Sequence, residues 1–352
     1  MASKSTLGAR PAPACRALRS VGSVRASIAG MRALIVGAGS VGQVFGHHLA
    51  RGGAEVSLLV KPKYADECRR GFTLYPAGRT PPRAQTFAAA SVLTAPDDAA
   101  GTAWDQIYLA VSSLALSSVD WLAALARATG DATVVFLQPN MDDRAIVTSV
   151  IDPGRVVDGT IGFVSYHAPL PGETRITEPG MAYWSPGPSR FSGERADGVV
   201  AALRRGKLPV RRVGDVAAAA AFQSAVLYAY IVALEAEGWS FRALRRGDRL
   251  ALAGRAAAQA MAIVGDRLGR PVPWRVRLAS RPVLVGMALR MMRWVAPLDL
   301  ETCLRVHFTK LGEQTRAAIR DYLGHGRTAG LPTDAVEQLA GAPALAAGAS
   351  IG

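Results

Sequence analysis

Short runs of apolar residues alternate with helical patterns from Met31 to about residue 138. Uninterrupted apolar strands of this kind are typical of a parallel sheet that helices cover on both faces. Helical stretches of mixed polarity separate the runs, as in repeated strand–helix units. We therefore predict strands at 32–37, 54–60, 104–111 and 132–138, with helices over 40–53 and 64–71.

The pattern changes after residue 155, where Gly and Pro residues interrupt three further strand-like runs. These runs, at 156–166, 174–186 and 209–215, predict an antiparallel or mixed edge on the same sheet. Beyond Asp215 the strand signals stop, and helical patterns rich in Ala, Leu and Arg continue to about residue 346. The sequence therefore predicts an α/β fold followed by an all-helical part.

Three segments follow from these changes. Residues 31–213 are predicted to form an N-terminal Rossmann-like doubly wound domain, and residues 214–345 a C-terminal all-helical domain. Residues 1–30, rich in Ala, Arg and Ser and without acids, have the composition of an organellar transit peptide. Met31 stands directly before the first strand, which favours a disordered extension or a start assigned too early. We expect a cytoplasmic protein.

A glycine-rich sequence, Gly-Ala-Gly-Ser-Val-Gly, joins the first predicted strand to the first predicted helix. In this context the pattern is that of a loop that binds the pyrophosphate of a dinucleotide. Gly37 permits a tight turn, Gly39 lets the backbone approach the phosphates, and Gly42 lets helix and strand pack closely. The N–H groups at the helix start attract the phosphates. The predicted cofactor-binding residues of this loop are Gly37, Ala38, Gly39, Ser40, Val41 and Gly42.

Two lysines, Lys61 and Lys63, follow the second predicted strand, where many nucleotide-binding strands end in an acid. In this fold that strand end lies beside the adenosine ribose. An acid there binds the ribose hydroxyls and repels a 2′-phosphate, whereas a cation attracts the phosphate. Solvated surface lysines are the alternative explanation. We predict that Lys61 binds the cofactor and that the cofactor is NADPH.

The net charge of +14 arises in two regions of the chain, residues 1–30 and 241–293. The first holds five Lys or Arg and no acid, and the second holds twelve Arg and two Asp. Solvated helix faces are the ordinary explanation for such arginines. Attraction of an acidic substrate or of a partner with an acidic surface is the alternative. The sequence holds no recognised nucleic-acid-binding motif, so we expect no nucleic acid partner.

Cysteine and histidine positions do not predict a metal site. Cys15, Cys68 and Cys303 are far apart and match no metal or redox spacing, which favours a reducing compartment. The pair His47 and His48 falls on the helix after the glycine loop and has no third ligand nearby in the sequence. We therefore expect no bound metal.

Two apolar stretches of the helical part raise the question of a membrane. Residues 216–234 are about long enough to cross a bilayer, but alanine dominates them, which favours a buried core helix. Residues 282–297 place Arg290 and Arg293 among large apolar residues, as an interfacial helix would. A partly buried helix with snorkelling arginines is the alternative. We expect no stable membrane insertion.

These motifs together resemble the ketopantoate reductase family, which reduces a 2-oxo acid with NADPH. The resemblance covers most of residues 31–345. It rests on MRALIVGAGSVG with Lys61 after the second strand, and on WDQIYLAVSS, ATVVFLQPNMDD and GHGRTAGLPT. It implies an N-terminal cofactor domain, a helical second domain, and a carbonyl substrate in the cleft between them.

Several positions depart from what the resemblance implies. The family's catalytic lysine would fall on or next to Ser224, and its asparagine one turn later on Tyr228. After the fifth strand the family has a Gln-Asn-Gly turn, whereas residues 138–140 of this chain are Gln-Pro-Asn. The asparagine is displaced by one residue, and Asn140 is therefore the candidate for positioning the cofactor. Ser112 and Ser113 stand where a lysine often follows the fourth strand, and Ser112 is carried over as cofactor-binding.

A replacement for the missing proton donor is sought in the densest polar stretch of the helical part, residues 301–315. His307, Lys310 and Glu313 follow one another at three-residue steps, which places them on one face of a helix. By the resemblance, Glu313 stands near a substrate-binding glutamate of the family. We predict Lys310 as the proton donor and Glu313 as its orienting or substrate-binding partner. An exposed face with ion pairs is the alternative.

The sequence therefore predicts an NADPH-dependent oxidoreductase that reduces a 2-oxo acid or related carbonyl in the cleft between its domains. A non-catalytic NADPH-binding or sensor protein on the same fold is the alternative, because the usual catalytic lysine is absent. The helical part is the candidate surface for a homodimer.

Overall fold

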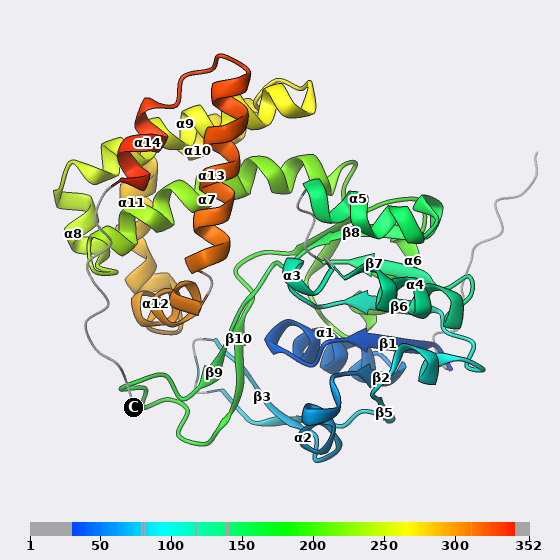
Figure 1. Ribbon diagram of the computed structural model, residues 1–352. Helices are drawn as coiled ribbons and strands as arrows, with labels where there is room; N and C mark the ends of the chain where they lie inside the picture. The colour runs from blue at the N-terminus through cyan, green and yellow to red at the C-terminus, as the bar shows by residue number, and fades with distance from the viewer. Residues whose placement is uncertain are drawn as a thin grey trace, which may run out of the picture.

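The computed structural model describes residues 30–78, 80, 82–116, 118–137, 141–310 and 312–341. Figure 1 shows a sheet-containing half, residues 30–215, beside a helical half, residues 216–341. The predicted α/β fold class with a helical second part is confirmed.

An eight-stranded sheet is the centre of the first half. Six strands run parallel, and β11 pairs antiparallel with β8 at one edge. The six parallel strands lie in the order β5-β2-β1-β6-β7-β8. When these six are numbered in chain order, this is the order 3-2-1-4-5-6 of a doubly wound fold. The strands in sheet order are β12 (Val210–Arg212), β11 (Ser189–Ser192), β8 (Val156–Thr160), β7 (Thr133–Phe136), β6 (Gln106–Leu109), β1 (Arg32–Val36), β2 (Glu55–Leu59) and β5 (Ser91–Leu93).

Helices cover both faces of this sheet. On β1, Ala33 and Ile35 point to the layer formed by α1 and α6, while Leu34 and Val36 point to the layer formed by α4 and α5. Strands buried on both faces explain why the predicted runs are apolar throughout. The helices of this half are α1 (Ser40–Arg51), α2 (Ala65–Arg69), α3 (Ser113–Leu116), α4 (Val119–Ala128), α5 (Met141–Val150) and α6 (Ala196–Arg205), with 3₁₀ turns at Pro62–Tyr64, Pro96–Ala99 and Pro153–Arg155.

A second, four-stranded sheet differs from the sequence prediction of one continuous sheet. Its order is β4 (Gln85–Phe87), β3 (Phe72–Pro76), β10 (Gly180–Trp184) and β9 (Val164–Ala168). The runs at 156–166 and 174–186 were expected on the edge of the main sheet, but only β8 joins it. The β3–β4 hairpin provides the partner strand, since β10 pairs in parallel with β3 and antiparallel with β9.

The second sheet lies between α1 and the helical half, as Figure 1 shows. Leu74 and Met181 on one face join the core around α1. Tyr75 and Ala182 on the other face pack in a cluster with Cys303 of α12 (Leu300–Lys310). The sheet therefore connects the layer over the glycine loop helix with the helical half.

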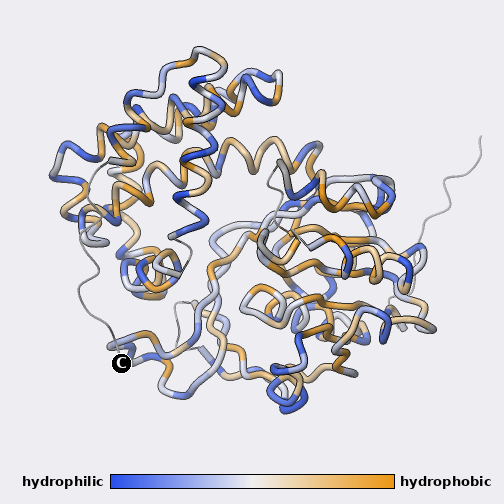
Figure 2. Tube along the Cα trace, in the orientation of Figure 1, coloured by the Kyte–Doolittle hydropathy of each residue, from blue (hydrophilic) through white to orange (hydrophobic). Residues whose placement is uncertain are grey.

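Two long helices, α7 (Val216–Ala236) and α9 (Arg249–Leu268), form the core of the helical half. Buried alanines on both helices allow close packing, and Figure 2 shows the apolar character of α7. Within the described ranges, α7 alone has the length and composition to cross a membrane. Around them lie α8 (Phe241–Arg246), α10 (Trp274–Ala279), α11 (Pro282–Val295), α13 (Gly312–Thr328) and α14 (Asp334–Ala340).

Candidate active site

The glycine loop between β1 and α1 has the backbone that its sequence predicts. Gly37 adopts φ +96°, and a Cβ atom there would lie 2.6 Å from the carbonyl oxygen of Ala110. A Cβ on Gly42 would lie 2.0 Å from the carbonyl oxygen of Gly37, so helix and loop are in direct contact. Gly39 has open space around its Cβ position. The loop is thus tight where it touches protein and open where a ligand would approach.

The start of α1 is available to an anion. Gly39 is its N-cap residue and provides no side chain to bond the first N–H groups, and the first turn holds no acid. The side chain of Gln43 on α1 donates to the carbonyl oxygen of Ala38 at 2.9 Å, and this hydrogen bond holds the loop against the helix. The uncapped N–H groups and the helix dipole favour a phosphate here.

Lys61 lies at the same sheet edge as the glycine loop. The Gly37 amide donates to the Leu59 carbonyl oxygen at 2.9 Å, which joins the ends of β1 and β2. Lys61 follows two residues later with an exposed side chain, and no carboxylate of the described residues pairs with it. The ammonium group of Lys63 instead lies 4.9 Å from the ring centroid of Tyr64. Lys61 therefore presents an exposed ammonium group at the sheet edge that carries the glycine loop.

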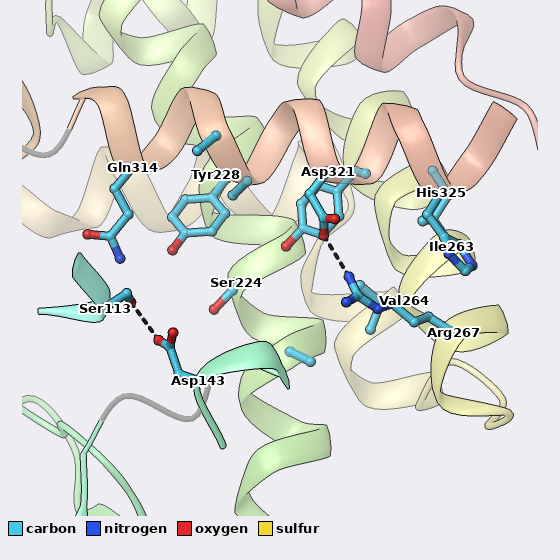
Figure 3. A pocket seen from close by; sticks show the side chains of 14 residues that line it. Ser113, Asp143, Ser224, Tyr228, Ile263, Val264, Arg267, Gln314, Asp321 and His325 are labelled. Atoms are coloured by element: carbon cyan, nitrogen blue, oxygen red, sulfur yellow. Dashed lines mark hydrogen bonds and ion pairs between the residues drawn. The ribbon is translucent and has the colours of Figure 1, made fainter. Parts of the chain in front are cut away.

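A pocket of about 290 Å³ opens between the two halves. Its walls come from the residues that follow β6 and β7 and from three helices of the helical half (Figure 3). The lining residues are Ser113, Asp143, Ala221, Ser224, Tyr228, Ile263, Val264, Arg267, Gln314, Ala317, Ala318, Asp321, Tyr322 and His325. Because β6 and β7 run parallel to β1, their carboxyl ends lie at the edge that carries the glycine loop. Ligands of open α/β sheets bind at this edge.

Polar groups gather at one end of the pocket. The Ser113 hydroxyl donates to the Asp143 carboxylate at 2.5 Å. Figure 3 shows Ser224, Tyr228 and Gln314 around this pair. Burial, and then the charge of Asp143, raise the pKa of the Tyr228 hydroxyl above its ordinary value. Tyr228 therefore keeps its proton at neutral pH and can donate a hydrogen bond.

An ion pair and a hydrogen bond lie at the other end of the pocket. The Arg267 guanidinium donates to Asp321 at 2.7 Å, and the His325 ring lies 2.9 Å from Asp266. Tyr322 also lines the pocket, and burial is the main cause that raises its pKa.

The predicted catalytic pair, Lys310 and Glu313, falls on two helices. Helix α12 ends at Lys310, whose side chain lies outside the described residues, and α13 begins at Gly312. Glu313 lies on α13 with a side chain that is 82% exposed, and its carboxylate binds Arg316 at 2.9 Å. It does not line the pocket, whereas its neighbour Gln314 does. The two residues therefore belong to successive helices.

The remaining predicted residues lie in different places. Ser112 is exposed after β6, and its carbonyl oxygen accepts hydrogen bonds from the amides of Ala115 and Leu116. Asn140, together with the turn at 138–140, lies outside the described residues. Ser113, one residue on from Ser112, lines the pocket.

Sequence reasoning did not select several pocket residues as site residues. Asp143 follows the fifth parallel strand directly after the turn at 138–140, and this position was its only signal. Arg267 and Tyr322 belong to helical patterns that give no sign of a pocket. Ser224 and Tyr228 were noted only as substitutions, and the structure places both in the pocket wall.

The histidine pair of α1 has a structural role. His47 Nε2 lies 2.8 Å from Gln85 Oε1, and His48 Nδ1 lies 2.8 Å from the Gly206 carbonyl oxygen. The other nitrogen of His48 lies 3.0 Å from the Tyr183 hydroxyl of the second sheet. In the described part of the chain, no cluster of three or more His, Cys, Asp or Glu residues could hold a metal ion.

Comparisons with known proteins agree with this architecture. Residues 33–189 match the family model described as ketopantoate reductase PanE/ApbA. No curated protein matches the sequence. Among solved structures, a PanE/ApbA family ketopantoate reductase from Ralstonia eutropha JMP134 is similar, with 21% identity and a TM-score of 0.63 over 88% of this chain and 96% of that chain.

Two further structures show the same fold. The 2-dehydropantoate 2-reductase from Geobacter metallireducens GS-15 has 17% identity and a TM-score of 0.63, over 88% of this chain and 98% of that chain. A D-mandelate dehydrogenase with NADH and anilino(oxo)acetate has 12% identity and a TM-score of 0.62, over 88% of this chain and 96% of that chain. Residues 33–189 are therefore similar to the ketopantoate reductase PanE/ApbA family, and the chain has the fold of these solved structures.

Proposed function

We propose that this protein is an NADPH-dependent reductase that converts a 2-oxo acid or related carbonyl compound to the alcohol. One observation carries the proposal: the pocket and the glycine loop occupy the same edge of the parallel sheet. A dinucleotide bound by the loop at Gly37–Gly42 would extend along this edge towards the ends of β6 and β7. Bound NADPH would supply a hydride to the carbonyl carbon.

Lys61 supports NADPH over NADH as the cofactor. The fold alone does not choose, since a D-mandelate dehydrogenase of similar fold is described with NADH. Lys61 offers an exposed ammonium group at the end of β2, where the adenosine ribose of a bound dinucleotide lies. A charge-assisted hydrogen bond to a 2′-phosphate contributes about 1.5–3 kcal/mol, or roughly ten- to a hundredfold in affinity.

Cofactor affinities of Lys61→Glu test this choice. We expect NADPH binding to weaken by about ten- to a hundredfold while NADH binding weakens little or improves, because the acid repels only the 2′-phosphate. Nicotinamide fluorescence titrations would measure both dissociation constants. Arg70→Glu makes the same charge change at an exposed residue after α2 and should leave both constants unchanged. Equal weakening of NADH and NADPH by Lys61→Glu would contradict the assignment.

Tyr228 is the proton donor that the pocket itself offers. Reduction of a carbonyl places negative charge on its oxygen, and a nearby acid must deliver a proton. The Tyr228 hydroxyl lines the pocket, and Ser224 and Gln314 stand beside it as hydrogen-bond partners for a bound carbonyl or carboxylate. Tyr228 stands one helical turn after the position where the resemblance places a lysine.

Replacing Tyr228 by Phe removes only the hydroxyl group. We expect kcat for 2-oxo acid reduction to fall by about 10²–10⁴-fold, the usual range for a general acid, with NADPH affinity unchanged. Tyr230→Phe is the matched control on the same helix, because its hydroxyl donates to the Ser280 carbonyl oxygen and lies outside the pocket.

A Lys310→Ala variant separates the two candidate donors. If Tyr228 donates the proton, Lys310→Ala should keep most of the parent kcat. The reverse result, with Tyr228→Phe active and Lys310→Ala inactive, would transfer the role to Lys310. Tight NADPH binding with no turnover across a panel of 2-oxo acids would favour the non-catalytic alternative.

A further inference from the structure

Helix α11 has apolar residues on two opposite faces. Its inner face packs on the core of the helical half through Val285, Leu289 and Met292. The spacing of four and three residues is that of one helix stripe. This face accounts for how α11 is held in the fold, and the remaining large apolar residues need a separate explanation.

The outer face of α11 is apolar and exposed. Val283 is 73% exposed, Met287 51%, Met291 54% and Trp294 64%. They recur at spacings of four, four and three residues, so they form a second stripe along the helix. On the adjacent α10, Trp274 is 68% exposed and Leu278 43%. Contiguous exposed apolar residues of this size mark interaction surfaces.

Arginines accompany this stripe, and acids are absent. The sequence between Asp266 and Asp299 holds no Asp or Glu. In the described part of the chain, no carboxylate pairs with any of the arginines of α10, α11 and the turn between them. These arginines are Arg275, Arg277, Arg281, Arg290 and Arg293. The surface is therefore an apolar stripe beside uncompensated positive charge.

Tryptophan and arginine side chains are paired at this surface. The Arg293 guanidinium lies 4.0 Å from the ring centroid of Trp294, and that of Arg275 lies 5.3 Å from the ring centroid of Trp274. Such pairs combine an apolar ring with a cation, which suits the boundary between lipid headgroups and acyl chains. Helix α11, with 14 residues, is about 20 Å long and could lie flat in that boundary.

Charge decides between the candidates that could cover this face. A second copy in a two-fold interface would oppose the same arginines across the contact, and like charges disfavour that pairing. Residues 1–29 carry five Lys or Arg and no acid, so they are repelled as well. An anionic lipid surface complements both features, because its headgroups attract the arginines and its interior accepts the apolar stripe.

We propose that the outer face of α10 and α11 docks the protein on an anionic lipid surface, with α11 lying in the plane of the headgroups. No residue of α10 or α11 lines the pocket. Figure 1 places α11 in the helical half, on the side remote from β1 and β6. Docking therefore leaves the cofactor edge accessible, and the proposal stands independently of the proposed function.

Co-sedimentation of the full chain with lipid vesicles tests the proposal. We expect binding to vesicles of phosphatidylcholine mixed with phosphatidylserine, weaker binding to pure phosphatidylcholine, and loss of binding in high salt. Arg290→Glu with Arg293→Glu should reduce the partition coefficient by at least about fivefold for each arginine. Met287→Glu with Met291→Glu should reduce it as well, because a charge then enters the apolar stripe.

The control changes the same charge at another exposed site. Arg205 of α6 and Arg211 of β12 are exposed residues of the sheet half. The double variant Arg205→Glu with Arg211→Glu should keep vesicle binding within about twofold of the parent protein, because only a long-range attraction that salt screens is changed. Absence of binding to phosphatidylserine vesicles would overturn the proposal. So would binding that the α11 variants retain, since the contact would then lie elsewhere. A dimer in light scattering that Met287→Glu dissociates would assign the face to a second copy instead.

Discussion

At the scale of single residues, His48 connects three parts of the fold. It lies buried on α1 and bonds to the Gly206 carbonyl oxygen after α6 and to the Tyr183 hydroxyl of β10. Burial lowers the pKa of His48 from its ordinary 6.5 to about 4. Between these two values the unfolded chain binds a proton that the folded chain excludes. The free energy of unfolding therefore falls as the pH drops from about 6.5 towards 4.

This linkage predicts a measurable pH dependence of stability. From pH 7 to pH 5, His48 should remove about 2 kcal/mol from the free energy of unfolding. Urea denaturation of the parent protein and of His48→Gln at both pH values would show it. The variant should lose less stability on acidification, by about that amount. His167→Gln changes an exposed histidine of β9 and serves as control. A pH dependence that is the same in His48→Gln and in the parent protein would count against the assignment.

Residue-level prediction from sequence succeeded where the backbone dictates the residue. The turn at Gly37 and the helix contact at Gly42 follow from local geometry, so a strand–loop–helix pattern sufficed to locate them. It does not extend to Glu313, because α12 ends before this residue and a periodic pattern holds only within one helix. Gln314 faces the pocket in its place.

At the scale of elements, the start of α7 is fixed by one side chain. Asp215 caps the helix by accepting a hydrogen bond from the Ala218 amide at 3.0 Å, and it also binds Arg270 after α9. Asp215→Ala should lower the free energy of unfolding by about 1–2 kcal/mol, as loss of an N-cap usually does. Asp215→Asn retains the cap and should cost less.

Urea denaturation midpoints would measure the effect at Asp215. Asp120→Ala, which removes an exposed acid from the first turn of α4, should change stability by no more than about 0.5 kcal/mol. If Asp215→Ala proved as stable as Asp120→Ala, the cap would not be what holds the beginning of α7.

The sequence located most strands by their periodicity, but it did not show which strands pair with one another. The runs at 156–166 and 174–186 were recognised as strands, but β3, which pairs with β10, lies about a hundred residues earlier in the chain. Alternation of polar and apolar residues reports which face of a strand is buried and carries no information on which strand lies beside it. For this reason the second sheet was predicted as an edge of the first.

At the scale of the whole molecule, the pocket exists only because both halves contribute to it. Ser113 and Asp143 come from the sheet half, whereas Ser224, Tyr228 and Gln314 come from α7 and α13. The sequence predicted a cleft between the halves through resemblance. It could not show which side chains meet there, since contacts between distant helices depend on packing angles.

The pairing of β8 with β11 sets a limit on how this protein can be divided. The match to the family model ends at residue 189, the first residue of β11. A fragment cut there would lose Phe191, which is fully buried, and would leave β8 as an open edge with unpaired backbone groups. Such edges recruit strands from other molecules. A boundary drawn from sequence similarity alone would thus cut through the main sheet, and a fragment that keeps this sheet whole extends at least through β12.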